Sequence, residues 1–440
     1  MSINQLEADV LTKQKRIAEI TRNHKGESLK SLAHNIDLEW LYVAFSRVRK
    51  DSAPGIDGVI ADHYVKNLRS NLERLLNEFK SGSYKAPAVK RVFIPKGNSN
   101  EKRALGVPTF EDKILQRAVH MVLEPVFEEY FYSFSHGFRA EHSAHLALDE
   151  FWLRCHQMNG GWLIDLDIRK YFDTIDHKLL RKMVLGRVCD GVITRILGKW
   201  LKAGVYENGN VKRSKMGTPQ GGVISPLLSN LFLHVVLDEW FVEVVKPRMS
   251  EDSFMVRYAD DALLLFKNRE DALKVFDVIH KRFLKYGLEL HPEKTKMMDF
   301  RNPSEGNKTR GTFNFLGFTH FWRKSFKTHR YYVGKRTAKD RFSRSLQAVN
   351  LWCNKHRHWK ILEQWKHLSK VLVGHYGYYG IIGNSERISS FRYFVIRIWF
   401  KWLKRRSRLR DLNWERFDKL LCRFQLPLPR IVHTSNIARL

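Results

Sequence analysis

The chain has 440 residues, and its 77 Lys and Arg against 46 Asp and Glu give a formal net charge of +31. Hydrophobic residues make up 43% and aromatic residues 12%, which is enough to build cores and excludes a wholly disordered chain. So much positive charge opposes compaction unless a polyanion neutralises it. Because the basic residues are spread along the chain instead of forming one amphipathic helix, we expect nucleic acid and not a membrane surface as the partner.

Neither export nor membrane insertion is indicated by the sequence. The N-terminal segment carries charge throughout and lacks the apolar stretch of a signal peptide. The uncharged run 216–237 contains Pro219 and Pro226, which favour a buried loop and helix over a membrane span. The four cysteines lie far apart without a CxxC pair, so we expect neither a disulfide framework nor a zinc ribbon. We therefore expect a cytoplasmic protein.

Helical periodicity dominates the first part of the chain. Apolar residues at helical spacing predict helices within 1–50, at 62–79 and at 110–131, where Pro125 predicts a kink or a break. Residues 89–108 alternate in a way that predicts a β-hairpin with a polar, glycine-containing loop.

The middle of the chain alternates strands and helices. The apolar run at 161–168 predicts a buried strand, and 176–188 a helix. A glycine-rich loop then leads into another helix, with Ser225 suited to its N-cap and Pro226 to its first helical position.

The same alternation continues towards residue 291. Residues 254–267 predict two strands around a tight turn, 270–286 a helix, and 287–291 a further strand. Strand, helix, hairpin, helix and strand is the order of a split βαβ, ferredoxin-like unit. Beyond residue 311, the segment 313–321 predicts one strand and the remainder is mostly helical in pattern. Residues 391–410 hold eight basic residues and no acidic one.

Three acids lie where apolar residues dominate. Asp167 belongs to the first of these strands, and Asp260 and Asp261 lie in the hairpin turn. The strands are neighbours in the proposed unit, so the carboxylates would repel each other unless cations separate them. Such oxygen ligands favour Mg²⁺, and two ions about 3.5–4 Å apart would stabilise the attacking and leaving oxygens of a phosphoryl transfer. An Asp-Asp pair can also be ordinary turn chemistry, and the acids alone leave that alternative open.

Longer motifs favour the first interpretation. They are RVFIPKGNSNEKRALGVP (91–108), LDIRKYFD (166–173), GTPQGGVISPLLSNLFL (217–233) and YADD (258–261). In this order they resemble the motifs of reverse transcriptases, and most closely those encoded by bacterial group II introns. Further segments resemble the same family: APGIDGV (53–59), HPEKTKMM (291–298), FNFLGF (313–318), VGHYGYYGIIGN (373–384) and WERFDKLLCRFQLPLPRIVH (414–433). The likeness spans roughly residues 30–433.

This resemblance implies an α+β right-hand polymerase with fingers, a ferredoxin-like palm, a mostly helical thumb or X region and a basic C-terminal module. The corresponding domains are an N-terminal helical extension at 1–50, fingers and palm at 51–310, the thumb and X region at 311–387, and the nucleic-acid-binding module at 388–440. Family members often end in an H-N-H endonuclease domain with paired cysteines. No such pairs occur here, so we expect no second-strand DNA cleavage.

The resemblance also assigns site residues. Asp167, Asp260 and Asp261 would be catalytic and bind two Mg²⁺ ions together with the backbone carbonyl of Ile168, and Mn²⁺ is expected to substitute. Residues that would bind the incoming nucleotide are Lys96, Arg103, Phe172 and Gln220. Residues that would contact nucleic acid are Tyr258, Lys294, Lys404, Arg405 and Arg406.

The implied function is RNA-directed DNA synthesis from dNTPs, combined with a maturase role in which the protein binds intron RNA and assists its splicing and mobility. Partners would be intron RNA, an RNA template with a DNA primer, and target DNA. Two alternatives stay open: a free-standing, intron-derived reverse transcriptase in defence or DNA repair, and an RNA-binding maturase with a vestigial polymerase. The sequence gives no indication of oligomeric state.

Overall fold

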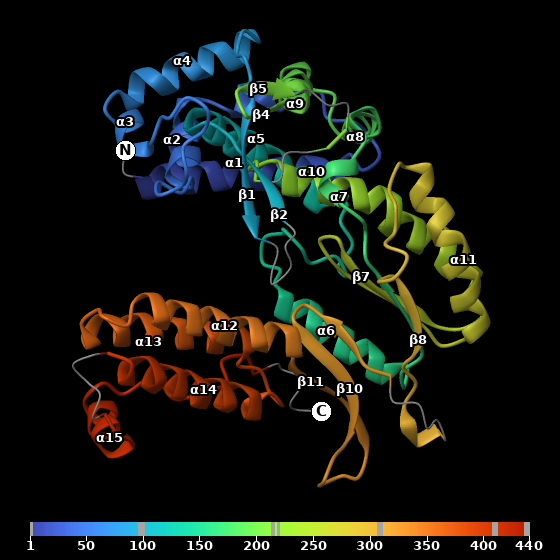
Figure 1. The fold of residues 1–440 in the computed structure, drawn as a ribbon. Coiled ribbons are helices and arrows are strands. Elements are labelled where there is room, and N and C mark those ends of the chain that lie inside the picture. The colour runs from blue at the N-terminus through green and yellow to red at the C-terminus, as the bar shows by residue number, and fades with distance from the viewer. Residues whose placement is uncertain are drawn as a thin grey trace. The chain divides into compact units, whose positions relative to one another are not determined.

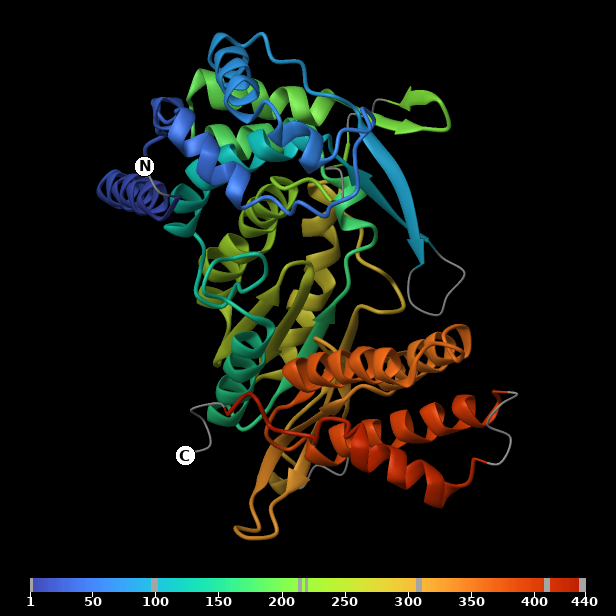
Figure 2. The same ribbon diagram turned by 90° about the vertical axis from the view of Figure 1, so that its left-hand side faces the viewer.

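The computed structural model describes residues 3–95, 102–212, 216–217, 221–305, 311–406 and 412–434. Packing divides the chain into two compact units, which Figures 1 and 2 show from two sides. The first unit comprises Met1–Ala147 and Leu163–Met297, and the second comprises Leu148–Trp162 and Met298–Leu440. Within the described ranges, no helix combines the length and the low polarity that a membrane span requires. The four-part domain division stays a prediction.

A helical layer forms the N-terminal part of the first unit. Its elements are α1 (Ile3–Asn23), η1 (Ala33–Asn35), α2 (Leu38–Ser46), α3 (Ala61–Val65), α4 (Leu68–Ser81), α5 (Phe110–Glu128), α8 (His177–Leu185) and α9 (Gly191–Lys202). Both α1 and α2 pack against α5, which is buried over most of its surface. Trp40 of α2 is fully buried, and its indole Nε1 donates to the carbonyl of Ala118, 3.0 Å away. This layer is the hydrophobic core of the N-terminal part.

Side-chain caps determine where several of these helices begin. Asp37 accepts a hydrogen bond from the backbone N–H of Trp40 at the start of α2, and Asp176 caps α8 in the same way. Asp190 accepts from two backbone N–H groups at the start of α9 and from two more at Leu32 and Ala33. The first N–H groups of a helix have no partner within it, so each cap stabilises its helix by about 1 kcal/mol.

A four-stranded sheet carries the predicted hairpin. Its strands are β1 (Val89–Pro95), β2 (Lys102–Val107), β4 (Val205–Glu207) and β5 (Asn210–Lys212), in the order β2-β1-β4-β5. β1 and β2 pair antiparallel, so the predicted hairpin strands are confirmed, and the residues that connect them lie outside the described ranges.

A second four-stranded sheet belongs mainly to the first unit. Its strands are β3 (Trp162–Leu166), β6 (Ser253–Tyr258), β7 (Asp261–Phe266) and β8 (Lys296–Asp299), in the order β6-β7-β3-β8. This is the order of a split βαβ unit, and the predicted ferredoxin-like arrangement is confirmed. The helices of this region are α7 (Tyr171–Thr174), α10 (Ser225–Leu233), the π-helical turns His234–Asp238 and Phe241–Val245, the 3₁₀ turn Lys246–Arg248, and α11 (Arg269–Lys285). Because α11 packs against β7, the apolar run of that strand is buried.

The second unit joins a small antiparallel sheet to a helical bundle. Its sheet contains β9 (Phe313–Phe315), β10 (Phe318–Lys324) and β11 (Tyr331–Thr337), in the order β11-β10-β9. Its helices are α12 (Lys339–Lys355), α13 (Ile361–Tyr379), α14 (Ser385–Lys404) and α15 (Trp414–Arg423); α6 (Ala144–Gln157) spans the boundary at residue 147, and a 3₁₀ turn covers Pro303–Glu305. The bundle core includes Tyr376, Phe391 and Trp399, each fully buried.

Several predicted elements have different bounds in the structure. The helix predicted at 62–79 is two helices, α3 and α4, and the strand predicted at 287–291 forms only an isolated bridge between Leu290 and Ile168. Ser225 lies inside α10, whose N-cap is Ile224. The strand predicted at 313–321 is a hairpin, because Leu316 and Gly317 both have positive φ angles and reverse the chain.

Pro125 lies inside α5, which continues to Glu128, so the predicted break does not occur there. A proline lacks the N–H that would bond the carbonyl four residues earlier, and this loss normally weakens a helix. Here that carbonyl belongs to Met121, and the side chain of Gln14 in α1 donates to it over 2.7 Å. A neighbouring helix therefore supplies the missing donor.

Candidate active site

The predicted acids lie where the neighbouring strands β3 and β7 end and begin, respectively. Asp165 lies in β3 and Asp167 directly follows the end of this strand, so the two acids point to the same side because side chains alternate with a period of two. Asp261 is the first residue of the neighbouring strand β7, and Asp260 precedes it in the turn. Burial, followed by the charges of Asp261 and Asp167, raises the pKa of Asp165 to about 7. The structure therefore brings acids from β3 and from the hairpin turn into electrostatic contact.

The backbone around Asp167 is held by the segment that contains the HPEKTK motif. The Asp167 carbonyl accepts from the N–H of His291 at 2.8 Å, and its N–H donates to the hydroxyl of Thr295 at 3.3 Å. Lys294 Nζ lies 3.5 Å from Asp167 Oδ2. Ile168 pairs with Leu290 in an antiparallel bridge. Lys294 is thus placed beside the predicted catalytic acid.

The turn that carries Asp260 has a strained backbone that its neighbours stabilise. Ala259 has a φ of +56°, a value that L side chains adopt rarely. The guanidinium of Arg257 donates to the Ala259 carbonyl over 2.9 Å. Gly137 packs so closely that an added Cβ would lie 2.1 Å from the nitrogen of Ala259, so only glycine fits there.

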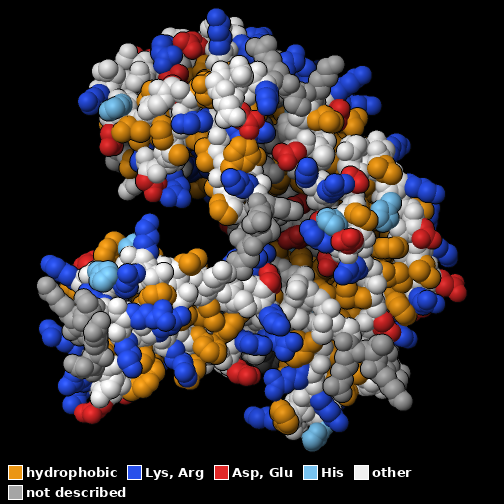
Figure 3. Space-filling view, viewed as in Figure 1, with side chains coloured by type: hydrophobic (Ala, Val, Ile, Leu, Met, Phe, Trp, Pro, Cys, Tyr) orange, Lys and Arg blue, Asp and Glu red, His pale blue; other side chains and the backbone are white. Residues whose placement is uncertain are grey.

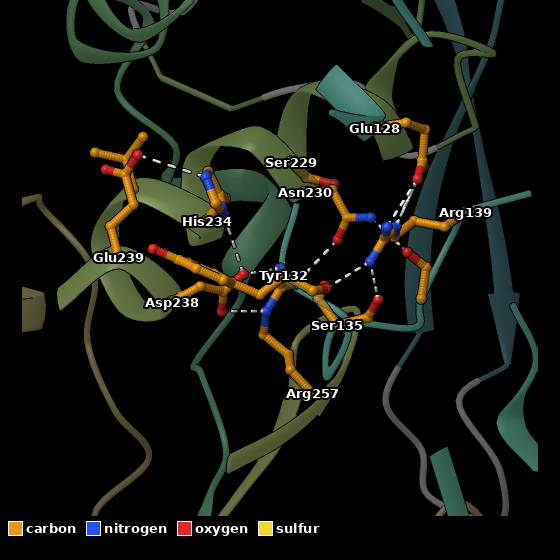
Figure 4. Close-up of polar contacts among 12 residues, drawn as sticks. Glu128, Tyr132, Ser135, Arg139, Ser229, Asn230, His234, Asp238, Glu239 and Arg257 are labelled. Carbon is orange, nitrogen blue, oxygen red and sulfur yellow. Dashed lines mark hydrogen bonds and ion pairs between the residues drawn. The ribbon is translucent and has the colours of Figure 1, made fainter. Parts of the chain in front are cut away.

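A buried ion-pair network (Figure 4) contacts this turn through Arg257. Arg257 and Asp238 are both fully buried, and their two hydrogen bonds measure 2.5 and 2.7 Å. Burial has the largest single effect and would raise the pKa of Asp238, but the charge of Arg257 and the hydrogen bonds from His234 and Arg257 together lower it. Arg257 also donates to Asn230, and Asn230 in turn donates to the carbonyl of Gly137.

His234 lies on the other side of Asp238 in the same network. Its ring nitrogens lie 3.6 Å from Asp238 and 3.4 Å from Glu239. Burial favours the neutral ring, but these two acids outweigh it and raise the pKa of His234. Both His234 and Asp238 belong to a π-helical turn, a geometry often found at functional sites.

A second arginine fixes the segment that contains Gly137 (Figure 4). Arg139 donates to the carbonyls of Tyr132 and Ser135 and forms an ion pair with Glu128 over 2.8 Å. The N–H of His136 donates to the carbonyl of Arg257 over 2.8 Å, which joins this segment to β6. The glycine that contacts the Asp260 turn is therefore held on both sides.

A second buried network holds the loop that follows Gln220. The Gln116 side chain accepts from the N–H of Val223 at 2.8 Å and donates to Asp112 at 2.8 Å. Asp112 also accepts from Tyr84 and Trp200, over 2.9 and 2.7 Å. Burial raises the pKa of Asp112 to about 6, although these donors oppose the shift.

The predicted nucleotide-binding residues are only partly described. Lys96 and Gln220 lie outside the described residues, and for Arg103 the structure gives the backbone position opposite Ile94 in the β1–β2 hairpin. Phe172 is half-buried in α7, with its ring centroid 5.3 Å from that of Tyr171. Gly221, with a φ of +112°, lies against β2, where an added Cβ would be 2.7 Å from the carbonyl oxygen of Gly106.

The predicted nucleic-acid contacts fall into two groups. Tyr258 ends β6 directly before the Asp260 turn, close to the acids. Lys404 and Arg405 are exposed at the end of α14 and line a cavity of about 730 Å³ that Trp414 also lines. Arg406 donates to the carbonyls of His358 and Trp359, so it also stabilises the loop between α12 and α13.

The residues that the structure describes show which groups could hold a metal. Among them, no three acidic, His or Cys side chains converge closely enough to hold an ion as they stand. The donor chemistry of Asp167, Asp260 and Asp261 nevertheless fits Mg²⁺, which prefers carboxylate oxygens and keeps several water ligands. Lys294 partly offsets the charge of Asp167 in this arrangement.

Comparison with known proteins agrees with this geometry. Residues 94–320, more than half of the chain, match the family model described as reverse transcriptase (RNA-dependent DNA polymerase). The chain belongs to this reverse transcriptase family. The matched region contains the whole β6-β7-β3-β8 sheet and all three predicted catalytic acids. The predicted right-hand polymerase fold class is confirmed.

The relatives include intron-encoded proteins. Protein YkfC of Escherichia coli is 41% identical over 203 residues, which cover 44% of this chain and 53% of that protein. Group II intron-encoded protein LtrA of Lactococcus lactis is 35% identical over 212 residues, covering 48% of this chain and 35% of that protein. The chain thus spans about half of one relative and about a third of the other. The resemblance to group II intron reverse transcriptases is confirmed.

Sequence reasoning missed the residues that support the site from inside. Asp238 and Arg257, and likewise Asp112 and Gln116, form partners only after folding. A lone acid in the apolar segment around Asp238 was the available signal, because buried acids are rare unless paired. Gln116 has no comparable signal, since a glutamine in an amphipathic helix is usually exposed.

Proposed function

We propose that the chain catalyses RNA-directed DNA synthesis, with Asp167, Asp260 and Asp261 as its catalytic acids. The observation that carries the proposal is the juxtaposition of β3 acids with the Asp260–Asp261 turn, above a fully buried Arg257–Asp238 pair. A structural hairpin turn needs no buried ion pair beneath it, since such a pair is costly to desolvate. The family match supplies the reaction class.

The three aspartates, with the backbone carbonyl of Ile168, would hold two Mg²⁺ ions, and Mn²⁺ should replace them. When bound, these ions stabilise negative charge on the attacking and leaving oxygens of the phosphoryl transfer. The protein holds the acids at fixed positions, and Lys294 limits their repulsion in the free enzyme. Catalysis then rests on positioning and electrostatics, without a covalent enzyme intermediate.

The nucleotide would bind where the loop before α10 meets the β1–β2 hairpin. Lys96 and Arg103 are proposed to contact its triphosphate, Gln220 to line the pocket, and Phe172 to lie under the sugar. The close approach of Gly221 to Gly106 supports this placement, because it sets the loop directly against β2. Tyr258 and Lys294, close to the acids, are proposed to contact the primer and template.

A maturase role is the second part of the proposal. Relatives carry the names group II intron-encoded protein and, in Arabidopsis thaliana, nuclear intron maturase 4. The net charge of +31 suits a large RNA, and Figure 3 shows Lys and Arg side chains spread over the face in view. Intron RNA and target DNA are therefore proposed as partners, with Lys404, Arg405 and Arg406 among the contacts.

The direct test is primer extension on poly(rA)/oligo(dT) with Mg²⁺. We expect the wild type to extend the primer and Asp260→Asn to lose several powers of ten in rate, each worth about 1.36 kcal/mol. RNA affinity should stay unchanged, because it comes from distributed basic residues. Asp252→Asn is the matched control, since Asp252 is exposed at the far end of the same hairpin. Near-normal extension by Asp260→Asn would refute the assignment.

A further inference from the structure

A basic groove lies on the helical part of the first unit, outside the candidate active site. It is a cavity of about 620 Å³ between α9 and the segment that follows α4, and its basic lining residues are Lys85, Arg181, Arg195, Lys199 and Lys202. We call it the α9 groove. In both ribbon views α9 lies at the end of this unit remote from β7 (Figures 1 and 2).

Among the described residues, the basic side chains of the α9 groove have no ion-pair partner. None of its lining residues is acidic, and within the described part of the chain no ion pair includes any of the five basic residues. Lys199 donates to the carbonyls of Gly82 and Tyr84, which fixes its position while its charge remains. Five like charges around one hollow oppose folding unless an anion binds there.

The spacing of the bases suits an extended anion. Arg195, Lys199 and Lys202 lie at i, i+4 and i+7 on α9 and therefore share one face of the helix. At 1.5 Å per residue this row is about 10 Å long, more than a single phosphate group spans. Between its first two members lies Gly198, where an added Cβ would be in van der Waals contact with the Arg181 guanidinium at 3.7 Å. Arg181 of α8 therefore lies beside this row and adds a further charge to it.

The lining also indicates which form of nucleic acid fits. Single strands are usually bound by exposed aromatic rings on which bases stack. The one aromatic residue of the α9 groove, Tyr84, is buried, and its hydroxyl donates to Asp112. Double-stranded RNA, in contrast, is recognised largely through its shape and phosphates.

From these observations we infer that the α9 groove binds the phosphodiester backbone of a duplex segment of nucleic acid, separately from the polymerase site. The inference rests on the proposed function, which supplies a structured RNA as partner. A DNA duplex offers the same phosphate chemistry, so the experiment includes both.

The test compares Arg195→Gln/Lys202→Gln and Arg195→Glu/Lys202→Glu with the wild type. The control is Lys281→Glu/Lys285→Glu, which reverses two exposed charges on α11 at the same net charge. Kd is measured against salt for a 20-base-pair RNA duplex, the DNA duplex of the same sequence, and single-stranded RNA of equal length. Removing two phosphate contacts should lower the salt slope by about 2 and weaken duplex binding by roughly 60-fold at 0.1 M salt.

The inference is supported if both groove variants lose duplex affinity while the control and the single-stranded RNA change little. Loss on both duplexes assigns the groove to duplex backbones in general, and loss on RNA alone assigns it to RNA. Unchanged duplex binding, equal loss on single strands, or equal loss in the control would overturn it. Extension at saturating poly(rA)/oligo(dT) should stay normal in the groove variants. A wild type that binds duplexes without extending primers would refute the polymerase proposal alone.

Discussion

The buried pair between Asp238 and Arg257 gives a quantitative prediction that separates stability from activity. Both side chains are fully buried, so removing Asp238 leaves the Arg257 charge uncompensated in the core, and removing Arg257 leaves Asp238 with His234 as its remaining charged partner. We expect Asp238→Leu and Arg257→Met each to lower the free energy of unfolding by about 3–5 kcal/mol. The double variant removes both charges together. We expect its loss of unfolding free energy to be smaller, by at least about 2 kcal/mol, than the sum of the losses in the two single variants.

Activity should not follow stability in this series. Arg257 also donates to the Ala259 carbonyl, and the double variant leaves that carbonyl without its donor, at a cost of about 1–3 kcal/mol. The turn that carries Asp260 then loses its anchor, so primer extension should stay low although the fold is partly restored. Urea unfolding and extension on poly(rA)/oligo(dT) would be measured on all four proteins. Additive losses within about 0.5 kcal/mol, or full activity in the double variant, would refute this reasoning.

Three further predictions concern the same region. The raised pKa of His234 contributes stability that is present below about pH 6.5 and is lost as the pH rises through the folded-state pKa. The difference in Tm between the wild type and His234→Gln should therefore shrink from pH 6 to pH 9. A constant difference would contradict the assigned shift. Gly137→Ala should impair extension by displacing the Ala259 turn, whereas Gly191→Ala, which meets nothing within 4 Å, should not; equal effects would exclude steric contact as the cause. Phe172→Ala should relieve the steric clash between the ring and the 2′-hydroxyl of a ribonucleotide. The ratio of kcat/KM for dTTP to kcat/KM for UTP should then fall, by about tenfold for each 1.4 kcal/mol of relieved clash. An unchanged ratio with a lowered Tm would show that the ring serves core packing.

Local sequence patterns predicted most of the elements that position the site. The apolar patterns at β3, β6 and β7 favour buried strands over other elements. The order of these strands along the chain matches one common sheet topology. The three acids were found because carboxylates are rare in such runs. These signals lie within a few residues of each other, which is why a sequence can reveal them.

Features that depend on distant partners were not predictable. α5 continues through Pro125 because Gln14, more than a hundred residues away, supplies the missing hydrogen bond. The hairpin at Leu316 and Gly317 lies inside an aromatic run whose alternation suggests one continuous strand. The sequence alone predicts an ordinary strand residue at Arg257, because its partner Asp238 lies beside it only in the folded protein. At Pro125 and Arg257 tertiary contacts decided the outcome over local preference, whereas at Leu316 and Gly317 a local turn interrupts the pattern.

The central claim is that Asp167, Asp260 and Asp261 form one centre that binds divalent ions. The direct test measures Mn²⁺ binding by electron paramagnetic resonance. The sample contains the protein, a chain-terminated primer, RNA template and the next dNTP. We expect two ions per wild-type molecule and fewer in Asp167→Asn and Asp260→Asn, with Asp252→Asn unchanged. Two ions bound with unaltered affinity in both site variants would contradict the claim.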